Sequence, residues 1–280
     1  MKILVTGSKG LVGRAVVAHC RTLGDEVIPT SHTELDISDA ANVGSFVAHS
    51  RPEYVINCAA WTDVDGCESD RERAFRENAE GPAHLARACR QIDAGFITIS
   101  TDYIFDGARE GFYTQDDSPR PLSVYAESKL AGEGLPQAEY ARAIIVRTGW
   151  IYGPGGRNFL SRVVELAQSG ANLTAISDAF GTPTYSLDLA ARLRELAALD
   201  APGIFHVVNS GPGASYLEFA RLALTTAGLS PNLVKSVRAN DLQRPAARPR
   251  NTRLSCLRQK ELGLAPLPDW QDAARRWLGE

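Results

Sequence analysis

The chain has 280 residues, of which 44% are hydrophobic and 22% are charged, and its net charge is −3. This composition is typical of a globular protein with one large domain, or one domain with a smaller lobe. The small negative charge argues against a general nucleic-acid binder, and no apolar run approaches the ~20 residues of a membrane span. Five cysteines without a CxxC pair favour reduced thiols, and with no signal peptide before the first predicted strand we expect a cytoplasmic protein.

The first predicted elements are a strand, a glycine turn and a helix. Lys2–Thr6 is apolar and β-branched, which predicts a buried strand, and Gly7, Gly10 and Gly13 follow in a GxxGxxG pattern. Apolar residues at helical spacing then continue to Leu23. In this context the glycines let backbone N–H groups approach a pyrophosphate at the positive end of the helix. The pattern therefore predicts a dinucleotide site, with a tight turn as the alternative.

The second predicted strand, Glu26–Thr30, bears on which dinucleotide is bound. Its end carries no carboxylate to hold a ribose diol. This weakens an assignment to NAD alone and admits a cofactor with a 2′-phosphate, for which Arg14 is a candidate partner. Asp36 is a candidate for contacting the adenine, with turn chemistry as the alternative, and Ser38 is a candidate helix cap.

Two further strands are predicted to end at the same edge of the sheet. Tyr54–Ala60 predicts a third strand that ends in small residues, against which a cofactor can lie, and Trp61–Glu68 predicts a polar loop. Gly95–Ser100 predicts a fourth strand that delivers Thr101 and Asp102 at its C-terminal end. In open α/β sheets, ligands bind at that edge.

Tyr125 and Lys129 are the candidate catalytic pair. If the stretch from Tyr125 to Gly134 is helical, their side chains lie one turn apart on one face. An ammonium beside a phenol lowers the phenol's pKa from its usual value near ~10, which suits a group that exchanges protons near neutral pH. Two unrelated surface residues are the alternative, and the arrival of Thr101 at the same sheet edge favours catalysis.

Strands and helices alternate to about residue 150, which predicts an α/β fold with a doubly wound parallel sheet. Arg142–Thr148 is its fifth predicted strand, and after Pro154 the spacing becomes less regular without a clear linker. We predict a dinucleotide-binding domain over residues 1–153 and a smaller substrate-binding lobe over residues 154–280, with the chain free to return to the first domain. Arg244–Arg258 is rich in arginine, which favours one anionic ligand or a solvated surface.

Several motifs resemble those of a known family. Ser100–Gly107 reads STDYIFDG, Val124–Glu133 reads VYAESKLAGE and Arg147–Gly153 reads RTGWIYG. With the glycine turn, these motifs resemble the extended short-chain dehydrogenase/reductases and, more closely, the dTDP-4-dehydrorhamnose reductase family. The resemblance spans nearly the whole chain. It implies a Rossmann fold and the NAD(P)H-dependent reduction of the C4 ketone of a nucleotide-linked 4-keto-6-deoxyhexose, with dTDP-4-dehydro-L-rhamnose as the leading candidate.

The resemblance also implies roles for individual residues. Tyr125 would protonate the alkoxide, Lys129 would stabilise the phenolate and bind the nicotinamide ribose, and Thr101 would hydrogen-bond the carbonyl. Further implied substrate contacts are Asp102, Tyr103, Val64 and Trp150, the last with core packing as an equal alternative. Implied cofactor contacts besides Tyr125 and Lys129 are Gly7, Gly10, Leu11, Val12, Gly13, Asp36, Ile37, Ala59, Ala60 and Thr62.

The resemblance further implies NADPH or NADH as cofactor and a monomer or homodimer. Some family members carry a divalent metal at a dimer interface, which makes Mg²⁺ a candidate ion, although no ligand cluster is evident in this sequence.

Alternative functions stay open. A 4,6-dehydratase would carry Asp-Glu after the threonine, where this chain has Asp102 and Tyr103, and an epimerase would retain tightly bound NAD. A non-catalytic NADP-binding regulatory subunit would not need the intact catalytic set. A 4-ketoreductase for another dTDP-deoxysugar keeps the chemistry, and it is favoured by Trp61 and Asp63, where many family members have Tyr and Ala.

Overall fold

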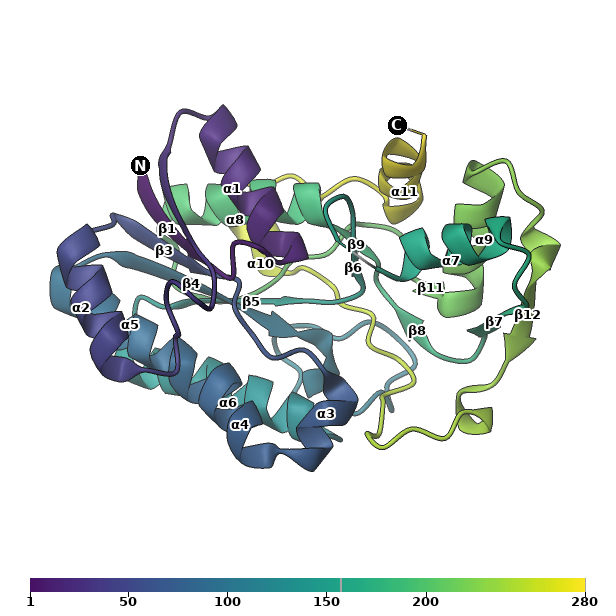
Figure 1. Ribbon diagram of the computed structural model, residues 1–280, viewed down its shortest axis with the longest axis horizontal. Helices are drawn as coiled ribbons and strands as arrows, with labels where there is room; N and C mark the ends of the chain where they lie inside the picture. Colours follow the sequence, from purple (N-terminus) through teal and green to yellow (C-terminus); the bar gives the residue numbers. More distant parts are fainter. Residues whose placement is uncertain (157, 280) are drawn as a thin grey trace.

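The computed structural model describes residues 1–156 and 158–279. Within these residues, the centre is a six-stranded parallel sheet in the order β10-β5-β4-β3-β1-β2, with helices on both faces (Figure 1). Its strands are β1 (Lys2–Thr6), β2 (Glu26–Thr30), β3 (Tyr54–Asn57), β4 (Gly95–Thr101), β5 (Ile144–Thr148) and β10 (Gly203–His206). The predicted doubly wound α/β fold is confirmed.

The strand order creates the crevice in which a ligand can bind. From β1 the chain runs to β2 on one side and then crosses to β3 on the other, so the winding direction reverses between β1 and β3. Thr6 pairs with Asn57 at the C-terminal ends of these two strands. Every residue of β3 and β5 is buried, as parallel strands covered on both faces require.

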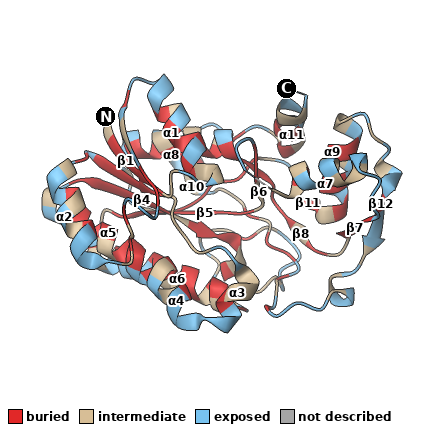
Figure 2. Cartoon of the chain, viewed as in Figure 1, coloured by how far each residue is buried: buried red, intermediate tan, exposed pale blue. Residues whose placement is uncertain are grey.

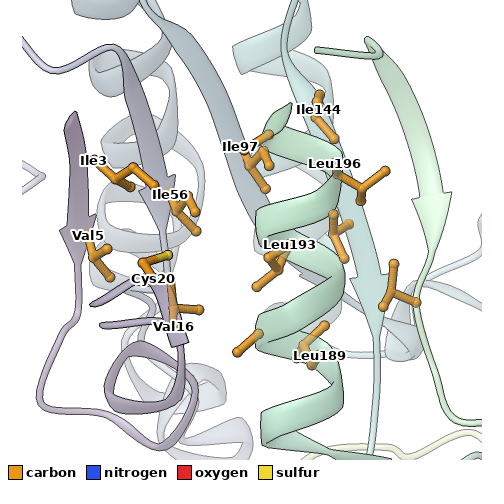
Figure 3. Close-up of a cluster of buried hydrophobic side chains, with 14 of the residues drawn as sticks. Ile3, Val5, Val16, Cys20, Ile56, Ile97, Ile144, Leu189, Leu193 and Leu196 are labelled. Atoms are coloured by element: carbon orange, nitrogen blue, oxygen red, sulfur yellow. The ribbon is translucent and has the colours of Figure 1, made fainter. Parts of the chain in front are cut away.

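Two layers of helices cover the sheet. One face carries α1 (Leu11–Thr22) and α8 (Ser186–Leu199), and the other carries α2 (Ala40–Ser50), α5 (Gly81–Ile92) and α6 (Val124–Glu139) (Figure 1). Buried residues concentrate in the sheet and on the inward faces of these helices (Figure 2). On the α1 and α8 face, Ile56, Ile97 and Ile144 of the sheet belong to one cluster with Leu193 and Leu196 of α8 (Figure 3).

A smaller lobe lies beside the C-terminal edge of the sheet (Figure 1). It contains α7 (Phe159–Gln168), α9 (Tyr216–Thr226), α11 (Trp270–Leu278) and the parallel pair β7 (Leu173–Ile176) and β12 (Val234–Val237). Two short pairs connect it to the sheet: β6 (Ile151–Tyr152) with β9 (Thr184–Tyr185), and β8 (Phe180–Gly181) with β11 (Ala214–Ser215). Capping boxes at Asn158 and Ser215 fix where α7 and α9 begin.

The connections contain short helices. They are α3 (Val64–Ser69), α4 (Arg71–Phe75), the π-helix η1 (Arg76–Glu80), the 3₁₀-helices η2 (Asp102–Ile104), η3 (Pro231–Leu233) and η4 (Ala239–Asp241), and α10 (Arg258–Glu261). The predicted polar loop Trp61–Glu68 is thus partly helical, because the Asp63 side chain caps α3 by accepting from the Gly66 N–H at 2.9 Å. The helices of the described residues include none with the length and apolar character of a membrane span.

Candidate active site

The glycine turn forms a cradle where β1 meets α1. Gly7 has a φ of 63°, and a β-carbon there would lie 2.7 Å from backbone atoms of Cys58 and Ala59. A β-carbon on Gly13 would lie 2.2 Å from the Gly7 carbonyl oxygen. The N-cap of α1 is Gly10, so no side chain caps its first N–H groups, and the first turn holds no acidic residue. These N–H groups are available to an anion such as a pyrophosphate.

Three adjoining cavities follow the C-terminal edge of the sheet. The first, of about 320 Å³, is lined by the predicted cofactor residues Gly7, Gly10, Asp36, Ile37, Ala59 and Ala60, among others. The central cavity, of about 370 Å³, shares Ala59 and Ala60 with it and is also lined by Val12, Thr62, Val64, Thr101, Asp102, Tyr103, Tyr125, Lys129 and Trp150. The third, of about 660 Å³, shares Tyr103, Trp150 and Tyr216 with the central one. Of the predicted site residues, Leu11 and Gly13 line none of the three cavities.

The candidate catalytic residues meet in the central cavity. The helix predicted from Tyr125 is present as α6, and Ser123 caps it by accepting from the Ala126 N–H at 3.3 Å. Tyr125 and Lys129 are both buried in its first turns, and Thr101 is buried at the end of β4. The Thr101 hydroxyl donates to Asp102 Oδ1 at 3.2 Å, and it is close enough to the Tyr125 phenol to influence the pKa of that group. The structure therefore assembles a phenol, an ammonium and a hydroxyl at one place.

The protonation of Tyr125 differs from the sequence-based prediction. Burial raises the pKa of its phenol well above the usual value; the Thr101 hydroxyl lowers it, and the Asp102 carboxylate raises it further. Lys129 is not among the causes of this shift, and its Nζ donates one hydrogen bond to the Ile99 carbonyl oxygen at 2.7 Å. The predicted lowering of the Tyr125 pKa is therefore wrong for this arrangement, and the phenol stays protonated at neutral pH.

Lys129 is held in place by a buried ionic network. Burial lowers the pKa of its ammonium to about 8, and the carboxylate of Glu133, one turn further along α6, raises it. Glu133 in turn forms a fully buried ion pair with Arg147 of β5, with an N–O distance of 2.7 Å. Ser100 of β4 also donates its hydroxyl to Glu133 at 2.5 Å. The network ties the helix that carries Lys129 to two neighbouring strands.

Asp102 places a buried carboxyl group in the same cavity. Its side chain is 2% exposed, and burial raises its pKa to about 7 despite hydrogen bonds from Thr252 and Thr101. The Oδ2 atom has no hydrogen-bond partner among the described residues. A β-carbon on Gly149 would lie 2.4 Å from Cγ of this carboxyl, so glycine is required beside it.

Aromatic rings form the wall between the central cavity and the third. Trp150 has a φ of 49°, and its ring stacks on Tyr216 of the lobe with a centroid distance of 3.8 Å. A β-carbon on Gly181 would lie 2.2 Å from the indole. The Tyr103 ring meets Tyr125 edge-on at 6.1 Å. Trp150 thus packs on the lobe and also lines the central cavity. A positive φ at a non-glycine residue is a strained conformation, and such residues are often found at functional sites.

Asn78 is a site residue that the sequence reasoning missed. It is fully buried in the π-helix η1. Its Oδ1 accepts from the Trp61 N–H at 2.8 Å, and its Nδ2 donates to the Trp61 carbonyl at 3.0 Å and to Ser128 of α6 at 3.1 Å. Asn78 therefore holds the loop before Thr62 against the catalytic helix. A π-turn has no sequence signature of its own, but such turns are frequent at functional sites.

The two loop residues that depart from the family pattern do not reach the cavities. Asp63 caps α3, and the Trp61 ring lies under the Arg73 guanidinium at 4.3 Å. Neither residue lines any of the three cavities. The residues of this loop that do reach the central cavity are Thr62 and Val64.

The predicted partner of a 2′-phosphate requires a correction. Arg14 does not line the first cavity, and its Nε donates to the Lys9 carbonyl oxygen at 2.8 Å. The cationic side chains in the wall are those of Lys9 and Arg73, with His32 beside them. Arg73 is already paired with Glu77 at 2.7 Å, which leaves Lys9 as the better candidate.

Metal binding finds no support in the described residues. They contain no group of three or more His, Cys, Asp or Glu side chains that could hold a metal ion. The expected Mg²⁺ therefore stays a prediction.

Comparison with known proteins identifies relatives of this chain. The family model described as "RmlD substrate binding domain" matches residues 1–280. The dTDP-4-dehydrorhamnose reductase of Mycolicibacterium smegmatis is 39% identical over 275 residues, covering 97% of this chain and 83% of that protein. A Streptomyces niveus protein named dTDP-4-keto-6-deoxy-D-glucose reductase is 34% identical, covering 96% of this chain and 94% of that protein.

Solved structures agree with these relatives. The dTDP-4-dehydrorhamnose reductase of Bacillus anthracis in complex with NADP is similar with a TM-score of 0.95 and 31% identity, covering 99% of each chain. The match of the family model over the whole chain, the relatives in sequence and this structural similarity lead to one conclusion: the chain belongs to the RmlD substrate-binding-domain family, the family of the dTDP-4-dehydrorhamnose reductases.

Proposed function

We propose that this protein uses NADPH to reduce the C4 ketone of dTDP-4-dehydro-L-rhamnose. The observation that carries the proposal is the meeting of Thr101, Tyr125 and Lys129 in one cavity. That cavity adjoins a glycine cradle on one side and an arginine-lined cavity on the other. The named relatives support the identity of the reaction.

The side chains divide the chemistry at the ketone. A bound nicotinamide cofactor would supply the hydride that the carbonyl carbon accepts. Thr101 donates a hydrogen bond to the carbonyl oxygen, and such a donor contributes about 2–4 kcal/mol in related oxyanion sites. The Tyr125 phenol, which burial keeps protonated, gives its proton to the much more basic alkoxide. The Lys129 ammonium would stabilise the phenolate that remains and would hold the ribose hydroxyls of the cofactor.

The described residues fit a dinucleotide. The uncapped N–H groups of Leu11, Val12 and Gly13 in the first turn of α1 would hold the pyrophosphate. Asp36 and Ile37 border the first cavity, which would hold the adenosine. Burial raises the pKa of the Asp36 carboxyl, but hydrogen bonds from Ser38 lower it by more, so the pKa lies below its ordinary value. Ser38 therefore binds this carboxylate, and Asp39 is the residue that caps α2.

The third cavity fits the nucleotide half of the substrate. Its described lining includes Arg244, Arg248 and Arg250 and no Asp or Glu, which suits a diphosphate. Tyr103 and Trp150 line both this cavity and the central one, so a sugar ring that reaches the catalytic residues would lie beside them. Val64 and Asp102 line the central cavity.

The test is the exchange of Tyr125 for phenylalanine. Tyr125→Phe should fold, bind NADPH and lose at least about 100-fold in kcat, because the proton donor is removed. Tyr140→Phe is the matched control, since that buried hydroxyl has no hydrogen-bond partner among the described residues and Tyr140 lines none of the three cavities. NADPH oxidation with the keto-sugar nucleotide measures turnover, and near wild-type turnover by Tyr125→Phe would contradict the proposal.

A second candidate keeps the chemistry and changes the sugar. The Streptomyces niveus relative favours it, since its name gives a different 4-keto-6-deoxyhexose. We expect the wild-type chain to prefer dTDP-4-dehydro-L-rhamnose by kcat/KM over the D-configured ketone. Stereochemistry of the product, read by NMR, distinguishes the two.

A further inference from the structure

One ion pair joins the cofactor side of the molecule to the arginine-lined cavity. Asp65 belongs to α3, directly after the loop that lines the central cavity, and Arg248 lies 183 residues later in the segment that lines the third. Arg248 Nη1 donates to Asp65 Oδ1 at 3.0 Å, and its Nη2 donates to Oδ2 at 2.8 Å. The Ala246 N–H also donates to Asp65 at 3.0 Å. One carboxylate therefore holds both a guanidinium and the backbone beside it.

The way Asp65 engages the guanidinium decides what Arg248 can still bind. A guanidinium has five N–H donors. The second Nη1 hydrogen is used by the Ala246 carbonyl oxygen at 3.0 Å, so both hydrogens of Nη1 and one of Nη2 are occupied. The Nε hydrogen and the second Nη2 hydrogen donate to no partner among the described residues, and these two N–H groups lie parallel on one edge. That edge is the fork that binds a phosphate or carboxylate with two hydrogen bonds.

The ion pair is better suited to positioning than to stability. The side chains are 21% and 38% exposed, and exposed ion pairs contribute little to folding. An arginine side chain, however, loses much rotamer freedom when it binds a ligand. If Asp65 has already fixed Arg248, the ligand does not bear that cost, which is the advantage of a preorganised site.

We propose that Asp65 is a positioning residue for substrate binding: it fixes Arg248 so that the free Nε and Nη2 edge binds the diphosphate of the nucleotide sugar. This inference rests on the proposed function, which gives the class of ligand. It adds which residues produce the affinity for that ligand. Asp65 lines neither the third cavity nor the central one. Its effect on the ligand therefore passes through Arg248.

The experiment measures binding apart from chemistry. Calorimetry with dTDP gives the affinity for the nucleotide half, and NADPH titration gives the affinity for the cofactor. Asp65→Asn should weaken dTDP about tenfold or more and raise KM by a similar factor. The kcat at saturation and the affinity for NADPH should change less than about twofold, because the catalytic residues are untouched. Unchanged affinity for dTDP would overturn the inference.

Two further variants separate positioning from structural support. Asp200→Asn is the matched control, since it also removes a carboxylate from an arginine pair, with Arg142 at 2.6 Å, outside the cavities. It should bind dTDP as the wild type does. The exchange Asp65→Lys with Arg248→Glu keeps an ion pair of opposite polarity, so the melting temperature should stay close to that of the wild type while dTDP binding stays weak. Restored affinity in that double variant would show a merely structural contact and overturn the inference.

Failure of the inference differs from failure of the proposed function. If dTDP binding depends on Asp65 but the wild type reduces no keto-sugar, the inference holds and the proposed reaction is wrong. If the wild type reduces the keto-sugar but Asp65→Asn binds dTDP normally, the proposed reaction holds and the inference is wrong. No binding of dTDP by the wild type would overturn the inference and the proposed nucleotide together.

Discussion

Tyr125, Lys129 and Asp102 line one cavity in which burial disfavours their charged forms. Burial raises the pKa of Tyr125 and brings the pKa values of Asp102 and Lys129 to about 7 and about 8. Groups buried this way lower stability wherever they must ionise, a cost often found at active sites. The phenol in turn stays protonated over a broad pH range, as a proton donor requires.

The burial of Asp102 should make the stability of the protein depend on pH. Its pKa is about 7 in the folded chain against an ordinary value of 3.8, so the folded state binds the proton more tightly. The resulting stabilisation is complete below pH ~4 and is lost as pH rises through ~7, and it amounts to roughly 4 kcal/mol at most. Asp102→Asn should therefore gain stability relative to the wild type as pH rises over that window. Urea unfolding of both proteins across it provides the measurement, and parallel curves would contradict the assignment.

At the scale of elements, the catalytic helix depends on its close approach to η1. A β-carbon on Gly132 of α6 would lie 2.0 Å from the Asn78 carbonyl oxygen. Asn78 also donates to Ser128 on the same helix, one turn earlier. Packing of the two helices at this distance fixes both α6 and the loop at Trp61, so a local change there should reach the cavity.

Two glycines of α6 offer a matched test of this contact. Gly132→Ala should cost about 2–3 kcal/mol of stability and reduce kcat/KM, because the added methyl group overpacks the contact with η1. Gly134→Ala, two residues further on, meets no atom within 4 Å and should stabilise the protein by about 0.5–1 kcal/mol. Thermal unfolding and steady-state kinetics of both variants give the comparison. Equal stabilities would show that the close approach of the helices is unimportant.

At the scale of the molecule, the second half of the chain completes the first sheet. β10 pairs with β5, and α8 packs beside α1 over the same face. Leu189, Leu193 and Leu196 of α8 are fully buried there (Figure 3). The central sheet thus contains strands from both sides of the predicted boundary at residue 153, so folding of the two parts should be coupled.

This coupling predicts the behaviour of a fragment. Residues 1–153 alone lack α8 and β10, which leaves apolar residues such as Ile97 and Ile144 uncovered. The fragment should therefore show no cooperative thermal transition and should bind a hydrophobic dye, whereas the full chain should unfold in one step. Circular dichroism and dye fluorescence are the measurements. A fragment that melts cooperatively and binds NADPH would establish an independent domain.

Local patterns in the sequence were sufficient for much of the site. The strand, glycine turn and helix at Gly7, the arrival of Thr101 at a strand end, and the helical spacing of Tyr125 and Lys129 all depend on neighbours within a few residues. Such short-range features are set by periodicity and backbone sterics. These local features predicted the α/β fold and the edge of the sheet at which the candidate catalytic residues lie.

Only the tertiary structure decided how these groups are charged and held. The Tyr125 pKa depends on burial by the whole surrounding, and the hydrogen bond from Lys129 to Ile99 depends on how α6 lies against β4. The pairing of Asp65 with Arg248 joins residues 183 positions apart. Burial and long-range contacts are properties of the packed chain, since they arise only when distant segments meet, whereas the helix and turn signals are already present in a short stretch of sequence.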